Sequence, residues 1–159
     1  MRDLRVRVAD YAVAKGDAVI STIGLGSCVA IAIYDAATRV GGLAHVLLPS
    51  EGLSRDMANR AKFPTTAVPL LLDEMRKLGA GGPFVAKIAG GSSMFGALIL
   101  EGGINMGERN VAAARRTLDQ HGVAVAGEDV GGDHGRSVYF HLTDGKVMVR
   151  SLKAGDLVL

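Results

Sequence analysis

The stretch from Ala18 to Tyr34 contains no charged residue, and Gly24 and Gly26 interrupt it near its middle. It is too short and too broken to be a membrane-spanning helix, which needs about 20 consecutive apolar residues. Residues 18–22 and 28–34 are instead rich in β-branched side chains, which favour strands. We therefore expect two buried strands joined by a sharp glycine bend, in a protein that is not inserted in a membrane.

The remaining chain predicts further strands and two clear helices. Apolar and charged residues alternate over 4–8, and strands are expected there and over 40–48, 84–88, 123–125, 136–142 and 146–152. The pair Gly41-Gly42 indicates a bulge, and Asp144-Gly145 indicates a two-residue hairpin turn. Helices are expected over 65–78 and 108–121, and the polar segment 51–63 is expected to hold a short one.

This order of elements predicts the α+β class. About seven strands stand against two or three helices, and strands that follow one another in the sequence usually pair antiparallel. No linker rich in proline, serine or charge divides the chain, and no internal repeat is evident. We expect a single domain over residues 1–159.

Composition excludes several classes of function. Lys and Arg number 18 and Asp and Glu 16, so the net charge of +2 is too small to attract nucleic acid strongly. The single cysteine cannot form an internal disulfide, and the N-terminus lacks the apolar core of a signal peptide, so a cytoplasmic protein is expected. The four histidines are scattered, and neither a metal site nor a cofactor is predicted.

Cys28 is the candidate nucleophile, because it follows the glycine bend and begins a strand. Such a bend can leave backbone amides of Gly26 and Ser27 free to stabilise an oxyanion. His45 lies on the following strand and can act as the base, and the Thr22 hydroxyl can bond to the far nitrogen of its ring. The alternative is that Cys28 is an inert buried thiol and that His45 and Thr22 only pack in their strands.

Three other glycine motifs are weaker. Gly24-Leu25-Gly26 lacks the third glycine and the helix of a dinucleotide site. The segment 91–96 lacks the Lys and Ser or Thr of a phosphate-binding loop. The run from Gly90 to Ser93 is similar to the serine loop of amidases but lacks its later glycines, so tight backbone packing is the favoured role.

Several further blocks of the sequence extend over nearly the whole chain. The first two surround the candidate residues, Thr22 to Val29 and Gly41 to Pro49. The others are Ala86 to Gly91 with Met94, Gly107 to Val111, Asp129 to Gly132 and Gly135-Arg136. Together these blocks resemble the chemoreceptor glutamine deamidase family, CheD.

The resemblance implies a cysteine hydrolase in which Cys28, His45 and Thr22 form the catalytic triad. It also implies a layered α/β/β sandwich similar to deamidating bacterial toxins. The expected reaction converts glutamine of chemotaxis receptors to glutamate and ammonia through a thioester, without a cofactor, and extends to glutamyl methyl esters. The expected partners are the receptors and a CheC-type CheY-P phosphatase, and a monomer is expected. The alternative is a noncatalytic chemotaxis adaptor that binds receptors or CheC.

Overall fold

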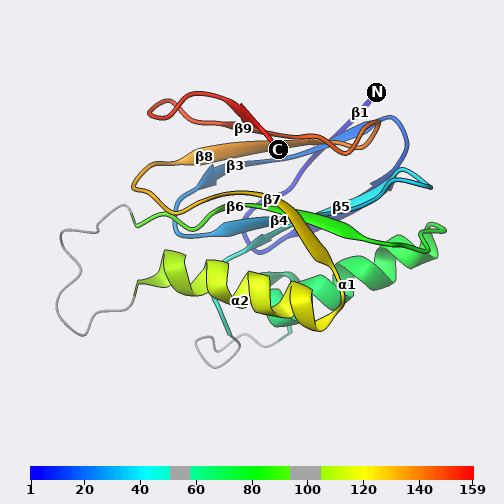
Figure 1. Cartoon of the computed structure of the whole chain (residues 1–159), viewed down its shortest axis with the longest axis horizontal. Coiled ribbons are helices and arrows are strands. Elements are labelled where there is room, and N and C mark those ends of the chain that lie inside the picture. The colour runs from blue at the N-terminus through cyan, green and yellow to red at the C-terminus, as the bar shows by residue number, and fades with distance from the viewer. Residues whose placement is uncertain (51–57, 94–104) are drawn as a thin grey trace.

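In the part of the chain that the structure describes, two five-stranded sheets face each other, and two α-helices cover the outer face of one of them (Figure 1). The computed structural model describes residues 1–50, 58–93 and 105–159. The strands in this part are β1 (Arg2–Arg5), β2 (Tyr11–Lys15), β3 (Ala18–Leu25), β4 (Val29–Asp35), β5 (Val40–Val46), β6 (Val85–Gly90), β7 (Ala124–Val130), β8 (Arg136–His141), β9 (Val147–Arg150) and β10 (Leu157–Val158). The helices are the short 3-10 helix η2 (Arg60–Lys62), α1 (Pro64–Lys77) and α2 (Met106–Gln120).

The sheets confirm the predicted α+β class and the layered sandwich. One sheet has the order β1-β3-β8-β9-β10, and the other has the order β2-β5-β4-β6-β7. Among the pairs that the structure describes, β1 with β3 and β6 with β7 are parallel, and the others are antiparallel. The molecule therefore has three layers, with the β4 sheet between the helices and the β3 sheet (Figure 1).

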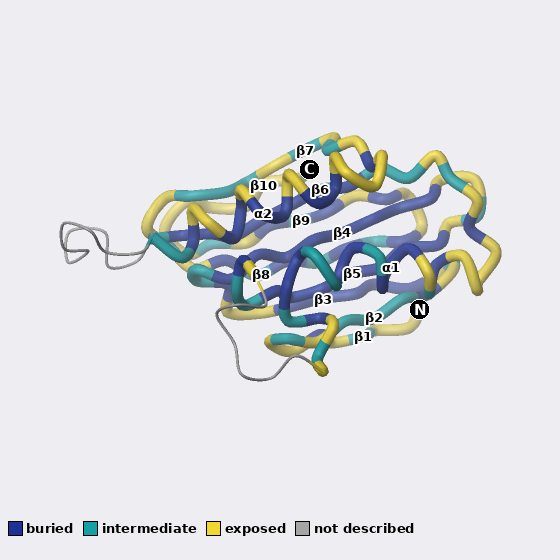
Figure 2. The backbone as a smooth tube through the Cα atoms, turned by 90° about the horizontal axis from the view of Figure 1, so that it is seen from below, coloured by how far each residue is buried: buried dark blue, intermediate teal, exposed yellow. Residues whose placement is uncertain are grey.

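β4 lies at the centre of the molecule and is buried along its whole length (Figure 2). Val29, Ile31 and Ile33 pack in the core beneath the helices. Ala30 and Ala32 point the other way, into the core between the two sheets. A strand that is covered on both faces must be apolar at every position, which explains the absence of charge before Asp35.

Five details differ from the sequence prediction. β1 ends at Arg5, β7 continues to Val130, and β10 was not expected. The hairpin between β8 and β9 exists, but its turn is longer than two residues, since the His141 amide bonds to the Lys146 carbonyl. β5 pairs without a bulge on both sides. Gly41 is instead needed for packing, because a side chain there would collide with Leu142 and Phe140.

The short helix expected within 51–63 is present as η2, and residues 51–57 lie outside the described part of the chain. Both longer helices begin within two residues of their expected starts. α2 begins at an Asn105 cap, whose side-chain oxygen accepts from the Glu108 amide at 3.0 Å. No helix in the described ranges is long and apolar enough to cross a membrane.

Candidate active site

The bend between β3 and β4 carries the chain from one sheet to the other, and Cys28 is its last residue. The pairing of β3 with β8 shifts register between Thr22 and Leu25. Gly24 lies in this irregular segment with φ +78°, a conformation that costs glycine little. Cys28 is 8% exposed and joins the core between the two sheets. The predicted bend therefore places the Cys28 thiol between the two sheets, where a small part of the residue's surface remains accessible.

His45 projects from β5 toward the same space. It pairs directly with Ala30 of β4, which faces the inter-sheet core. Side chains two residues apart on a strand share a face, so Cys28 and His45 are diagonal neighbours on one side of the sheet. His45 is fully buried, and its Nε2 has no hydrogen-bond partner within the described part of the chain.

Thr22 reaches His45 from the opposite sheet. It lies on β3, is fully buried, and its Oγ1 is 2.7 Å from His45 Nδ1. The hydroxyl also donates to the Val6 carbonyl at 2.7 Å. The structure thus brings all three predicted side chains to one end of the inter-sheet core, with the histidine between two strands that do not share a sheet.

The hydrogen bonds of Thr22 determine the tautomer of His45. A threonine hydroxyl has one hydrogen, and here that hydrogen goes to the Val6 carbonyl. Toward His45 the oxygen can only accept, so Nδ1 must carry the ring proton. In the neutral ring Nε2 then holds a free lone pair, which is the form that a general base requires.

Burial sets the charge states of the Cys28 thiol and the His45 imidazole. It lowers the pKa of His45 to about 4, so the imidazole is neutral near pH 7. It raises the pKa of the Cys28 thiol, and the residue's own backbone amide partly opposes this shift. The resting pair is therefore a neutral thiol and a neutral imidazole, and a thiolate requires proton transfer to Nε2.

The loop after β6 holds the bend between β3 and β4 through its backbone. The Gly91 amide donates to the Cys28 carbonyl at 2.8 Å, and the Ser92 amide donates to the Gly26 carbonyl at 2.9 Å. Gly90 has φ +110°, and a Cβ at this position would collide with the Cys28 carbonyl oxygen. The sequence favours a role in tight backbone packing for the run from Gly90 to Ser93, and these contacts confirm it.

Sequence reasoning missed two buried polar residues near the bend. The first is Arg136 of β8, which is 3% exposed and donates to Asp129 Oδ2 at 3.0 Å and to Ser92 Oγ at 3.0 Å. It connects the two sheets beside the loop that holds Cys28. A single arginine at the start of a strand carries no sequence signal for such a role, because its partners come from two segments that are distant in the sequence, β7 and the loop after β6.

The second is Asn110 of α2, whose Nδ2 donates to the Ser27 carbonyl at 2.9 Å and to the Leu47 carbonyl at 3.1 Å. The sequence does contain a signal for this residue. Asn110 lies one helical turn before Ala114, on the apolar face of the helix, where a polar side chain is expected to have a specific partner.

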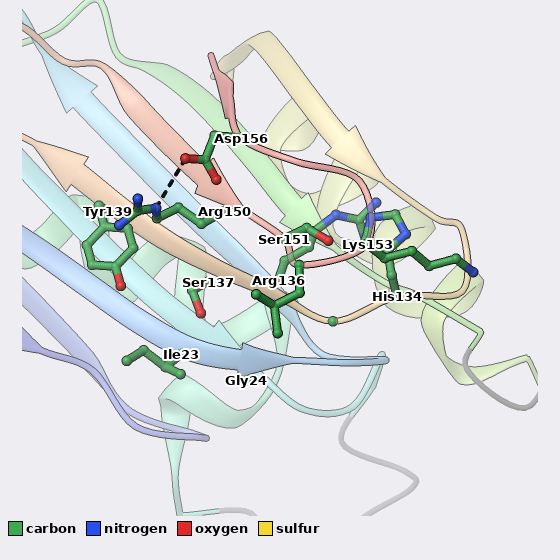
Figure 3. Close-up of a pocket in the computed structure, with 12 residues that line it drawn as sticks. Ile23, Gly24, His134, Arg136, Ser137, Tyr139, Arg150, Ser151, Lys153 and Asp156 are labelled. Carbon is green, nitrogen blue, oxygen red and sulfur yellow. Dashed lines mark hydrogen bonds and ion pairs between the residues drawn. The ribbon is translucent and has the colours of Figure 1, made fainter.

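A hollow of about 680 Å³ on the outer face of the β3 sheet does not include the candidate residues (Figure 3). Ile23 and Gly24 of β3, Tyr139 of β8 and Arg150 of β9 line part of it. Its charges are largely paired, since Arg150 contacts Asp156 at 3.3 Å. The alternating strand geometry turns Ile23 outward where Thr22 points inward, so the sheet separates this hollow from the thiol.

No group of three or more His, Cys, Asp and Glu side chains lies close enough to hold a metal ion in the ranges that the structure describes. The candidate site instead consists of one thiol, one imidazole, one hydroxyl and backbone amides. These groups suit nucleophilic attack on a carbonyl carbon followed by proton transfer to a leaving group.

Comparisons with known proteins give one consistent result. Residues 47–151 match the family model described as CheD chemotactic sensory transduction. A protein of Pyrococcus abyssi named probable chemoreceptor glutamine deamidase CheD is 44% identical over 158 residues, which cover 99% of this chain and 96% of the relative. Relatives with that description from Haloarcula marismortui and Geobacter metallireducens are each 45% identical, over 98% and 94% of this chain and 89% and 94% of their own lengths. The relatives match nearly the whole chain, including the segment that contains Thr22, Cys28 and His45, whereas the family-model match begins after these residues.

Proposed function

Since this chain belongs to the CheD family, we propose that it deamidates glutamine side chains of chemotaxis receptors, with Cys28 as nucleophile, His45 as base and Thr22 as the residue that orients the ring. The relatives' names supply the substrate class. The observation that carries the catalytic assignment is the hydrogen bond between Thr22 Oγ1 and His45 Nδ1 at 2.7 Å. It leaves a buried, unprotonated Nε2 on the face of the sheet that Cys28 shares.

In the first half of the reaction, His45 Nε2 takes the thiol proton as the Cys28 sulfur attacks the amide carbon of the substrate glutamine. The carbonyl π bond breaks and its electron pair goes to the oxygen. The amide of Cys28 is the first candidate to stabilise this oxyanion, with the backbone amides of Ser27 and Gly26 as further candidates. The tetrahedral intermediate then collapses, and its C–N bond breaks as Nε2 returns the proton to the departing ammonia.

In the second half, a water molecule attacks the thioester. His45 Nε2 takes a proton from this water and returns it to the Cys28 sulfur when the C–S bond breaks, so the enzyme regains its neutral pair. The products are glutamate and free enzyme, and no cofactor is needed. A glutamyl methyl ester fits the same route, with methanol as the leaving group in place of ammonia.

The neutral resting pair is compatible with this cycle. The imidazolium is disfavoured at a site that lowers the pKa of His45 to about 4, so it passes its proton readily to the leaving group. The Thr22 oxygen accepts from Nδ1 throughout and therefore keeps the ring in one orientation. In apo structures catalytic hydrogen bonds are often incomplete, and substrate binding is expected to bring the thiol within reach of Nε2.

We place the protein in the cytoplasm, where the modified part of the receptor lies, as a monomer that a CheC-type phosphatase can restrain. The test is to incubate it with receptor cytoplasmic fragments and to measure ammonia and the conversion of Gln to Glu by mass spectrometry. The native chain is expected to convert glutamine, and Cys28→Ala is expected to be inactive while still binding the fragment. Full conversion by Cys28→Ala would refute the nucleophile. Binding without conversion by the native chain would identify a noncatalytic adaptor.

A further inference from the structure

Asn110 is a fully buried amide where α2 meets the bend between β3 and β4, which ends at Cys28. Its Nδ2 carries two hydrogens, and both have acceptors, the Ser27 carbonyl at 2.9 Å and the Leu47 carbonyl at 3.1 Å. Ser27 directly precedes Cys28, and Leu47 lies two residues after His45. One side chain thus joins the segment that carries the nucleophile to the segment that carries the base.

The bond to Ser27 also fixes the amide of Cys28. The Ser27 carbonyl and the Cys28 N–H belong to one planar peptide unit, in which they point in opposite directions when the bond is trans. The Ser27–Cys28 bond is not among the cis bonds of the chain. The Ser27 carbonyl points toward α2, where it accepts the hydrogen bond from Asn110. The Cys28 N–H therefore points away from the helix, toward the inter-sheet side on which the Cys28 sulfur lies.

The position of α2 is itself closely defined. Gly107 lies one helical turn before Asn110, and a Cβ there would collide with the carbonyl oxygens of Gly91 and Ser92. Those two residues bond through their amides to Cys28 and Gly26. The first turns of α2 therefore contact the bend between β3 and β4 directly through Asn110 and indirectly through the loop after β6.

We infer that Asn110 is a positioning residue for the proposed deamidation, which holds the Cys28 amide toward the reacting atoms and keeps the Cys28 and His45 segments in register. Asn110 does not touch the substrate. This inference rests on the proposed function, and it predicts a defect in the chemical step rather than in substrate binding.

The test compares Asn110→Leu, which keeps the size of the side chain and removes both donors, with Thr117→Val. Thr117 is a matched control because it is also buried on α2, and its hydroxyl bonds only within the helix, to the Ala113 carbonyl at 2.8 Å. It lies seven residues from Asn110, about 10 Å along the helix axis. Melting temperatures establish that each variant is folded, and Asn110→Ser replaces Asn110→Leu if that variant does not fold.

For Asn110→Leu we expect kcat to fall roughly tenfold or more with KM nearly unchanged, because small misplacements of catalytic groups mainly affect the chemical step. We also expect iodoacetamide to alkylate Cys28 about threefold more slowly, since the thiolate loses its nearest amide. Thr117→Val should retain native values of both. Equal kcat and equal alkylation rates in the two variants would overturn the inference. The alkylation comparison needs no receptor, so it remains decisive even if the native chain releases no ammonia.

Discussion

The Thr22 hydroxyl oxygen lies 2.7 Å from His45 Nδ1, although β3 and β5 belong to different sheets. The same hydroxyl bonds to the Val6 carbonyl, just after β1. The contact therefore has two consequences. It holds the two sheets together at a buried polar point, and it fixes the ring proton of His45 on Nδ1, so that Nε2 carries none.

Replacement of Thr22 by Val keeps the shape of the side chain and removes its oxygen. Both the Val6 carbonyl and the His45 N–H then lose their partner in a buried site, which is expected to cost about 1–3 kcal/mol of unfolding free energy. Turnover should fall roughly ten- to a hundredfold, because the ring is no longer held in one tautomer and orientation. Urea denaturation and ammonia release measure the two effects. Thr22→Ser keeps the hydroxyl and should recover most of the activity; if it is as impaired as Thr22→Val, the hydroxyl is not the functional group.

Stability should fall in mild acid because of His45. Burial lowers its pKa from 6.5 to about 4 in the folded protein, so between these values the unfolded chain binds the proton more readily. The stability that the neutral ring contributes is complete above about pH 6.5 and is lost as the pH falls toward 4, by up to about 3 kcal/mol. Urea denaturation of the native chain and of His45→Gln at pH 7 and pH 4.5 tests this. The native chain should lose more stability than the variant, and parallel losses would show that His45 is not responsible.

The sequence predicts the layers of the fold better than their edges. The uncharged stretch around the glycine bend predicts a central strand reliably, because β4 is buried on both faces and such a strand must be apolar at every position. β10 is two exposed residues paired only with β9, and such a short edge strand has no periodicity to detect. The parallel pairing of β1 with β3 likewise depends on tertiary contacts that no local pattern encodes.

In the candidate site, too, some features follow from the local sequence pattern and others depend on tertiary contacts. The places of Cys28 and His45 on adjacent predicted strands indicate that the two side chains lie close together, and the antiparallel register of β4 with β5 makes them neighbours. The contact of Thr22 with His45 crosses between sheets, so its geometry follows from how the sheets stack and not from strand order. Asn110 and Arg136 act on backbone groups or on distant segments, and residue spacing carries no information about these partners.

The free thiol should react slowly with alkylating agents at neutral pH. Burial raises the pKa of Cys28 above its ordinary value, and the neutral His45 supplies no positive charge to oppose this. The pH profile of iodoacetamide alkylation, followed by mass spectrometry, should therefore have its midpoint above that of a cysteine in an unstructured peptide. His45→Ala should slow alkylation near pH 7 further, because Nε2 can no longer accept the thiol proton. A midpoint well below pH 7 would instead indicate a preformed thiolate and imidazolium pair, contrary to the resting state derived from burial.

Gly90→Ala should damage the site more than an equally strained glycine substitution elsewhere. Gly90 and Gly16 both have positive φ, +110° and +83°, so alanine at either is strained, by roughly 1–2 kcal/mol in the left-handed region. A Cβ at Gly16 meets no atom within 4 Å, whereas at Gly90 it meets the Cys28 carbonyl oxygen. Backbone on both sides must then move, which is expected to cost about 2 kcal/mol more and to displace the nucleophile. Urea denaturation and kcat of the two variants separate strain from displacement: Gly16→Ala should lose some stability and keep its kcat, while Gly90→Ala should lose both. Equal kcat values would mean that the loop after β6 does not hold Cys28 in its reactive position.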